Sequence, residues 1–117
     1  MNLRESLRKD AIERVIDTAQ RMQQGTVHPV EGSRLICTLR MNIYNPDPDD
    51  SLYDVFIMVK QETHDLPESM RPGTKYESIL RSATVKLNEY ATLMQPVILK
   101  ACVDLVTRLS SAVQVMR

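Results

Sequence analysis

Residues 79–116 read ILRSATVKLNEYATLMQPVILKACVDLVTRLSSAVQVM, and this stretch decides the fold. Its apolar residues recur at steps of three and four, the spacing that places side chains on one side of an α-helix. They are Ile79, Ala83, Leu87, Tyr90, Met94, Ile98, Ala101, Leu105, Leu109, Ala112 and Met116. The stripe keeps its phase across Pro96, where a loop would usually reset it. The pattern predicts one long helix with a kink near residues 92–96, and two nearly collinear helices are the alternative.

A loop and a shorter apolar segment precede this helix. Pro67, Pro72 and Gly73 mark residues 63–75 as a loop. The segment before it shares a helical face made of Leu52, Val55, Phe56 and Val59. Its candidate N-caps are Asp49, Asp50 and Ser51. The run from Val55 to Val59 would also fit a buried strand. We predict a helix, because no other segment offers a strand partner and a lone strand leaves its backbone groups unpaired.

Two further helices are predicted in the N-terminal part of the chain. Residues 3–24 carry an apolar side made of Leu3, Leu7, Ala11, Ile12, Val15, Ile16, Ala19 and Met22. Gly25 follows where a residue with positive φ can end the helix, and Pro29 is well placed to open the next one. The apolar face of that second helix is Gly32, Leu35, Ile36, Leu39 and Ile43. It should end near Tyr44, because residues 45–48 (NPDP) cannot continue a helix. On the inner face, Gly32 would let a neighbouring helix come close.

The composition agrees with packed helices. The chain has 117 residues, which fit one domain, 1–117, with a core of its own. Four Tyr and one Phe are its only aromatic residues, so the core must be built from Leu, Ile, Val, Met and Ala. We predict an all-α, single-domain helical bundle with three N-terminal helices and a long C-terminal helix.

Charge and cysteine content narrow the classes of function. Fifteen basic and fifteen acidic residues cancel, so no global field attracts a phosphate backbone. The first residues lack the apolar run of a signal peptide, and no segment approaches the roughly 20 apolar residues that span a bilayer. Two Cys, sixty-five positions apart, fit free thiols in a reducing compartment. We expect a cytoplasmic protein that binds neither nucleic acid directly nor a membrane.

An acidic stretch is the most unusual feature of the sequence. From Tyr44 to Glu68, seven acidic residues stand against one Lys, a balance of −6 (one minus seven). Helix capping and solubility are one interpretation. The other is a docking face for a basic partner, because complementary potential raises association rate and selectivity. The residues assigned to partner binding are Asp47, Asp49, Asp50, Asp54, Glu62, His64, Asp65 and Glu68.

Metal binding is an alternative for some of the same side chains. Glu31, Glu62, His64 and Asp65 carry the donor types that hard or borderline metals take. Carboxylate-rich bundles supply Glu and Glu-x-x-His sets from several helices, and here the order is reversed and the set is incomplete. A solvated polar loop explains these residues without a metal. We therefore predict no metal and no cofactor, and keep a metal-binding helical enzyme as the alternative.

Other residues with reactive potential have plain structural interpretations. Cys37 and Cys102 stand beside apolar residues, where a thiol has a raised pKa and is inert. Glu31 and Arg34 are spaced for a helix-surface ion pair, with a functional charge pair as the other interpretation. Gly25, Gly32 and Gly73 never cluster, so they build no phosphate-binding loop. We predict no catalytic residue.

Two segments resemble a family of small uncharacterised bacterial proteins. The first is Val30-Glu31-Gly32-Ser33-Arg34-Leu35 with Leu39-Arg40, which is similar to the Glu-Gly-Cys-Arg-type segment of the family. The second is Val55 to Val59 running into Gln61-Glu62-Thr63-His64-Asp65-Leu66-Pro67, which is similar to its Ser-Glu-Thr-Asp segment before Leu-Pro. The likeness extends from Val15 to Arg108. Ser33, Gln61 and His64 depart from the family pattern, and the family has no firmly assigned activity.

Size, helical make-up and lack of catalytic apparatus also resemble the immunity proteins of bacterial contact-dependent toxin systems. Such proteins neutralise a cognate toxin domain by occluding its active site or its partner-binding face. The resemblance implies that the chain is a binding protein and not an enzyme, and that its acidic stretch faces a basic, nuclease-type toxin. A homodimeric scaffold, in which the long C-terminal stripe pairs with its symmetry mate, is a further alternative.

Overall fold

The computed structural model describes residues 3–43, 50–64 and 77–116, and every regular element within these stretches is helical. In chain order the elements are α1 (Leu3–Gln24), α2 (Pro29–Arg40), the 3-10 helix η1 (Asp50–Tyr53), α3 (Asp54–Glu62) and α4 (Glu77–Met116). The predicted all-α fold class is confirmed. The choice of helix over strand for residues 55–59 is also confirmed, because they lie in α3.

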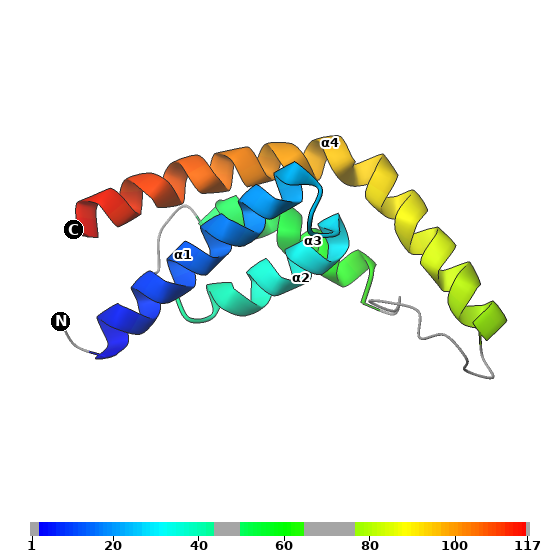
Figure 1. Ribbon diagram of the computed structural model, residues 1–117, viewed down its shortest axis with the longest axis horizontal. Helices are drawn as coiled ribbons and strands as arrows, with labels where there is room; N and C mark the ends of the chain where they lie inside the picture. Colours follow the sequence, from blue (N-terminus) through cyan, green and yellow to red (C-terminus); the bar gives the residue numbers. More distant parts are fainter. Residues whose placement is uncertain (1–2, 44–49, 65–76, 117) are drawn as a thin grey trace.

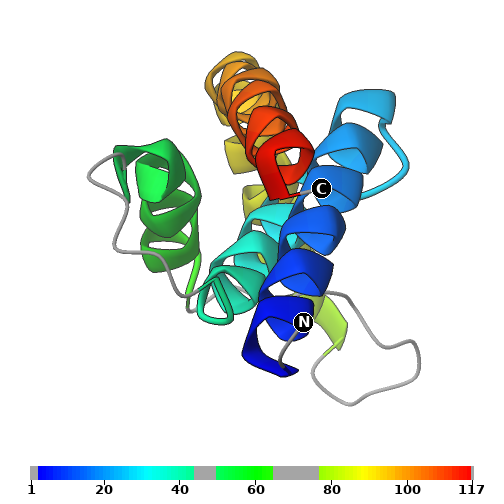
Figure 2. The same ribbon diagram turned by 90° about the vertical axis from the view of Figure 1, so that its left-hand side faces the viewer.

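The long helix α4 arches over the other helices, which lie on its concave side (Figure 1). α1 runs beside the C-terminal half of α4, and α2 packs against α1 as an antiparallel neighbour. α3 lies at the edge of the molecule, against α2 and α4 and away from α1 (Figure 2). The molecule measures 51 × 29 × 24 Å. None of the helices within the described stretches is long and apolar enough to cross a bilayer.

α4 continues through Pro96 and bends near its middle (Figure 1). Its 40 residues would extend about 60 Å in a straight helix, more than the longest dimension of the molecule, 51 Å. Pro96 has no N–H to donate to the carbonyl of Thr92, and its ring crowds that carbonyl, which is the usual cause of a kink. The Pro96 side chain is exposed. The prediction of one helix with a kink near residues 92–96 is confirmed.

The core is mostly aliphatic, as the composition predicts, but it also holds the aromatic residues Phe56 and Tyr53, which the prediction left out. Its fully buried members include Ile12, Val15, Val30, Ile36, Phe56, Val59, Ile98 and Leu105. α4 turns the described middle of its apolar stripe toward this core, since Leu87, Ala101 and Leu109 are buried as well. Each fully buried aliphatic or Phe side chain contributes about 1.5–3 kcal/mol relative to an exposed one. Packing of the stripes therefore stabilises the fold.

Gly32 gives α1 and α2 the close approach that the sequence predicts. It is buried in α2, and a Cβ atom on it would lie only 2.6 Å from Cγ of Met22 in α1. The Met22 side chain also reaches α4, where the Cys102 thiol lies 3.9 Å from its sulfur. One buried thioether thus joins three helices.

The C-terminal end of α1 follows the expected glycine geometry. Gly25 has a φ of 79°, in the left-handed region. The N–H of Gly25 donates to the carbonyl of Met22 (3.2 Å), and the N–H of Thr26 donates to the carbonyl of Arg21 (3.0 Å). These two bonds define a Schellman helix end, which satisfies carbonyls that have no partner within the helix.

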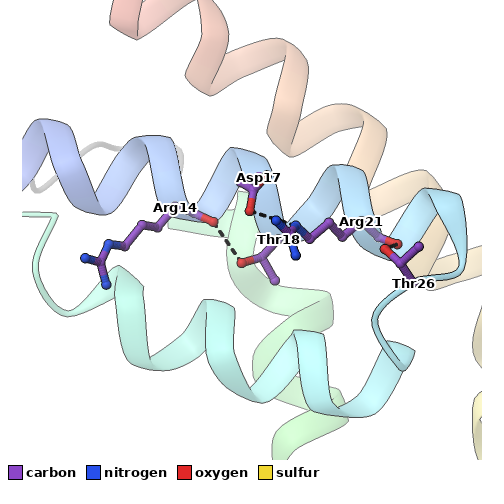
Figure 3. Close-up of polar contacts among 5 residues, drawn as sticks. All are labelled: Arg14, Asp17, Thr18, Arg21 and Thr26. Carbon is purple, nitrogen blue, oxygen red and sulfur yellow. Dashed lines mark hydrogen bonds and ion pairs between the residues drawn. The ribbon is translucent and has the colours of Figure 1, made fainter.

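The solvent side of α1 carries charge pairs at i, i+4 spacing. Asp10 pairs with Arg14 at 2.9 Å and Asp17 pairs with Arg21 at 3.0 Å. Figure 3 shows the second pair together with the Thr18 hydroxyl, which donates to the Arg14 carbonyl at 2.8 Å. Because these charges are exposed, each pair contributes only a few tenths of a kcal/mol, by the usual magnitude for such pairs.

α2 ends earlier than predicted. Its last residue is Arg40, and the predicted end near Tyr44 is wrong. The N–H groups of Met41, Asn42 and Ile43 donate to carbonyls three residues back, at 3.3, 3.0 and 3.0 Å. The chain therefore tightens into successive turns that satisfy the last carbonyls of the helix.

α3 begins later than its predicted caps. Asp50 and Ser51 belong to η1, and α3 starts at Asp54 with Tyr53 as its N-cap, so the predicted capping of the α-helix by Asp50 or Ser51 is wrong. Asp49 lies outside the described residues. The 3-10 turn brings the Tyr53 ring into the core at 7% exposure, with the Arg40 guanidinium 5.5 Å from the ring centroid.

Among the side chains that the structure describes, three residues of the predicted apolar faces are exposed: Leu3 (76%), Leu7 (52%) and Leu35 (45%). α1 has 22 residues and α2 has 12, and α2 starts beside the C-terminal end of α1. The first turns of α1 therefore extend beyond the end of α2. Leu35 lies at the edge of its face, about 100° around the helix from the fully buried Ile36.

Candidate functional site

The candidate site is built around α3, the short helix at the edge of the molecule (Figure 2). Phe56 and Val59 anchor α3, because both are fully buried against the neighbouring helices. Val55, Ile57 and Met58 are half-buried on its flanks. Among the described elements α3 contacts η1, α2 and α4, and its side chains of Asp54, Lys60 and Glu62 are exposed.

Three of the eight predicted partner-binding side chains fall within the described residues, and all three are exposed: Asp54, Glu62 and His64. Asp50 appears as the first residue of η1. The other predicted residues, Asp47, Asp49, Asp65 and Glu68, lie outside the described stretches. The docking face as a whole therefore stays a prediction.

The described acidic residues share one side of α3. Asp54, Met58 and Glu62 follow each other at intervals of four residues, so they lie in a row along the helix. Asp54 stands in the first turn, where a negative charge also favours the helix dipole. The two interpretations of the acidic stretch are compatible at this residue, because a carboxylate can stabilise the helix and still face a partner.

Glu62 is held in place by α4. The Tyr90 hydroxyl donates to Glu62 Oε2 at 2.6 Å. Burial raises the pKa of Tyr90 well above its ordinary value, and the hydrogen bond to Glu62 and the negative charge of Glu62 raise this pKa further. Tyr90 therefore stays protonated and donates at any physiological pH. The sequence placed Tyr90 on the apolar stripe and gave no indication of this partner.

The two segments on which the family resemblance rests meet in space. The Arg34 guanidinium in α2 donates to the backbone carbonyl of Thr63, which follows α3. Thr63 is fully buried, and its hydroxyl donates to the carbonyl of Val59 at 2.6 Å. A positive charge at the C-terminal end of a helix is favourable. Arg34 thus stabilises the end of α3, a role that the predicted pairing with Glu31 did not include.

His28 connects α2 to α4. As the N-cap of α2, its Nδ1 accepts from the N–H of Val30 at 3.1 Å. Its Nε2 lies 3.1 Å from Oδ1 of Asn88 in α4. Because Nδ1 accepts, this geometry assigns the proton to Nε2, which donates to Asn88. His28 therefore has a structural role, because it caps α2 and connects it to α4.

A groove of about 510 Å³ separates the C-terminal part of α2 from α3. Its lining residues are Cys37, Arg40, Met41, Ile57, Lys60, Gln61 and His64. The volume lies within the range of small-molecule sites. Of the predicted partner-binding residues, His64 lines this groove, and its Nδ1 lies 2.9 Å from the Gln61 carbonyl. The groove joins residues from two helices and was not predicted.

Both thiols are buried and have raised pKa values, as the sequence predicts. Burial raises the pKa of Cys102 to about 11. Burial also raises the pKa of Cys37, although the nearby charges of Lys60 and Arg40 oppose this effect. Both cysteines are free and buried. A thiol that stays protonated is a poor nucleophile.

The residues of the alternative metal site were Glu31, Glu62, His64 and Asp65, and the described structure does not bring them together as a group. Across residues 3–43, 50–64 and 77–116, no three His, Cys, Asp or Glu side chains gather as a metal-binding group. Glu62 accepts from Tyr90, and Asp65 lies outside the described residues.

Comparison with known proteins adds no relative: no family model, no curated protein and no solved structure matches the chain. The resemblance to small uncharacterised bacterial proteins and to immunity proteins therefore remains a prediction from the sequence. The fold and the site define a helical domain with an exposed edge helix.

Proposed function

We propose that this protein binds a basic protein partner and neutralises it, as an immunity protein neutralises its toxin. The observation that carries the proposal is the outward face of α3, where the exposed carboxylates of Asp54 and Glu62 flank the half-buried Met58. An apolar centre with a charged rim is typical of surfaces that bind proteins. A nuclease-type toxin domain, which must attract phosphate, would present the complementary positive charge.

The polar contacts around α3 support binding without large rearrangement. The Arg34–Thr63 and Tyr90–Glu62 hydrogen bonds fix the C-terminal end of α3 to α2 and to α4. A surface held in this way loses little conformational entropy when a partner binds, which favours affinity. Free thiols fit a reducing cytoplasm, which is the location we propose.

The scaffold alternative is less favoured. In that alternative two copies of the chain pair through the apolar stripe of α4. However, Leu87, Ile98 and Leu105 from that stripe are buried within a single chain. Pairing through this stripe would require the monomer to open. The outward face of α3 needs no such opening.

The test begins with tagged protein isolated from its native cells and identification of the bound partner by mass spectrometry. The captured partner must be toxic when expressed alone, and co-expression of the protein must restore growth. The variant Asp54→Asn with Glu62→Gln removes both charges, and the Gln side chain can still accept from Tyr90. We expect this variant to lose rescue and to bind the partner at least tenfold more weakly at low salt, as electrostatic docking predicts.

A second double variant tests whether the loss of any two exposed carboxylates has the same effect. Glu13→Gln with Glu89→Gln removes two exposed carboxylates from α1 and α4, and rescue should be unchanged. If no captured protein is toxic, the proposed neutralising function is wrong. If both double variants rescue equally well, the assignment to the α3 face is wrong.

A further inference from the structure

The convex side of α4 carries an exposed apolar patch at the bend. Leu93, Pro96 and Val97 are neighbours at i, i+3 and i+4 spacing, and all three side chains are exposed. Leu93 is 77% exposed, although it is a large apolar residue. No helix of the described stretches covers this side of α4 (Figures 1 and 2). The patch lies opposite the buried stripe of α4, so pairing through it leaves the core intact.

The patch belongs to a longer seam along α4. The exposed residues of this seam follow each other at alternating steps of four and three: Glu89, Leu93, Pro96, Lys100 and Val103. Two packed helices meet along seams with this spacing. The seam therefore suits a helix of a partner molecule.

Charged side chains flank the patch in a self-complementary order. Lys86 and Glu89 precede it, and Lys100 and Asp104 follow it. All four are exposed, and none of them is in an ion pair with another of the described residues. Within each pair the Lys precedes the acidic residue, which is the less favourable order for an ion pair along one helix. These charges are placed to pair across an interface.

A two-fold axis at the level of residues 94 and 95 brings these charges to their opposites. In an antiparallel pair of α4 helices related by this axis, residues at equal distances from the axis face each other. Glu89 of one copy then faces Lys100 of the other, and Lys86 comes within one residue of Asp104. Leu93 faces Pro96 at the centre. Because the symmetry repeats each contact, opposite charges meet on both sides of an apolar centre.

The size of the face indicates a weak dimer. Residues 86–104 extend about 27 Å along α4, and a helix with its side chains is about 10–12 Å wide. Two such faces bury about 1,000 Å² in total when they pair, at the lower limit for a specific interface. A dimer of micromolar affinity, in equilibrium with its monomer, fits these dimensions.

We propose that the protein forms a two-fold symmetric homodimer through the convex face of α4, with Leu93, Pro96 and Val97 at the centre. Pairs of Glu89 with Lys100 lie on both sides of this centre. The partner is a second copy because the charges of the face match their own two-fold image, which an unrelated partner does not require. The proposal does not rest on the toxin-neutralising function, since the surface proposed for the toxin is on α3.

Sedimentation velocity of the full chain between about 10 µM and about 1 mM tests the dimer over the range that its size implies. We expect a reversible shift from monomer to dimer. Leu93→Gln should weaken the dimer at least tenfold, because each dimer carries the substitution twice. Leu3→Gln is the matched control, since Leu3 is 76% exposed on α1, and it should leave the dimer unchanged. A chain that stays monomeric throughout, or equal dimerisation of the two variants, overturns the proposal.

Charge reversal tests the two-fold arrangement. Glu89→Lys places Lys opposite Lys, and Lys100→Glu places Glu opposite Glu, so each variant alone should dimerise at least tenfold more weakly at low salt. An equimolar mixture of the two variants restores both pairs and should form a heterodimer about as tightly as the unmodified chain. If the mixture dimerises no better than either variant alone, the proposed interface is wrong.

Glu13→Lys and Lys60→Glu control for net charge. They make the same charge changes at exposed positions of α1 and α3, and each alone should dimerise as the unmodified chain does. If they weaken the dimer as much as the α4 variants do, net charge is the cause and the proposed pairing is wrong.

The dimer and the toxin-neutralising function fail separately in these experiments. The double variant Glu13→Gln with Glu89→Gln loses one of the proposed pairs, so it should dimerise more weakly and still rescue growth. A monomeric chain that neutralises its partner overturns the dimer alone. A dimer with no toxic partner overturns the neutralising function alone.

Discussion

Met22 and Gly32 compete for one space between α1 and α2. A Cβ atom at position 32 would overlap the Met22 side chain, which is buried. Gly32→Ala gains about 1 kcal/mol of helix propensity and costs about 1–3 kcal/mol by overpacking. We expect a net loss of about 1 kcal/mol in the free energy of unfolding, measured with urea. In a Met22→Ala background the space is empty, so the same substitution should stabilise by about 1 kcal/mol.

Gly32→Ala is thus expected to destabilise the unmodified chain and to stabilise the Met22→Ala background. Gly25→Ala is the matched control for this difference. A Cβ atom there meets no neighbouring atom, but its φ of 79° disfavours any residue other than glycine. Gly25→Ala should therefore cost about 1 kcal/mol in the unmodified chain and in the Met22→Ala background alike. If Gly32→Ala destabilises both backgrounds equally, contact with Met22 is not the reason for the glycine.

At the scale of single residues, backbone roles were predictable and polar partners were not. Gly25, Pro29 and Gly32 have roles set by their own conformations or by their lack of a side chain, which the sequence displays. His28 and its partner Asn88 are sixty positions apart in the chain. Only the packing of α4 beside the start of α2 brings them together, and His is an uncommon N-cap.

The Arg34 guanidinium determines how firmly α3 is held at its C-terminal end. Arg34→Met keeps much of the apolar stem and removes the donor to the Thr63 carbonyl. Since hydrogen bonds to charged groups contribute about 1.5–3 kcal/mol, we expect a loss of about 2 kcal/mol in unfolding free energy. Hydrogen exchange should quicken at the amides of residues 59–63, and less in α1. Global stability and exchange are measured on the same sample.

Arg21→Met is the matched control for Arg34→Met. Arg21 makes an exposed pair with Asp17 at i, i+4 spacing (Figure 3), so its loss should cost no more than about 0.5 kcal/mol. If the two variants are equally stable and exchange around Thr63 is unchanged, the Arg34 contact does not stabilise the end of α3.

At the scale of helices, periodicity predicted the faces and most boundaries. α1 spans residues 3–24 as predicted, and α4 continues across Pro96 because its stripe keeps one phase. The end of α2 and the exposed Leu3 and Leu7 could not be predicted in the same way. Whether the end of an apolar stripe is covered depends on the length of the neighbouring helix, and that information lies elsewhere in the chain.

The candidate site was predictable only where it depends on composition. The exposed Asp54 and Glu62 belong to a stretch whose charge is evident in the sequence. The groove is different, because Cys37 and Lys60 are twenty-three positions apart and become neighbours only when α2 packs on α3. A group of residues that comes from two different helices leaves no pattern in the local sequence from which it could be predicted.

The whole molecule should lose stability at alkaline pH. Burial raises the pKa of Cys102 from 9.0 to about 11, and the pKa values of Cys37 and Tyr90 are raised as well. Above pH 9 the unfolded chain releases thiol protons that the folded chain retains, so the unfolded state binds fewer protons. The free energy of unfolding must then fall as pH rises. The contribution of Cys102 is fully present below pH 9 and is lost as pH rises toward about 11.

Replacement of Cys102 isolates its share of this loss. Between pH 8 and pH 11 the unmodified chain should lose about 2 kcal/mol more unfolding free energy than Cys102→Ala, because a two-unit pKa difference is largely expressed over that range. Urea unfolding at half-unit pH steps measures both curves. Ile98→Val, a buried change without a titrating group, should lower stability by about 1 kcal/mol at every pH and leave the slope unchanged. If Cys102→Ala retains the full alkaline slope, the buried thiol is not the group whose proton the fold protects.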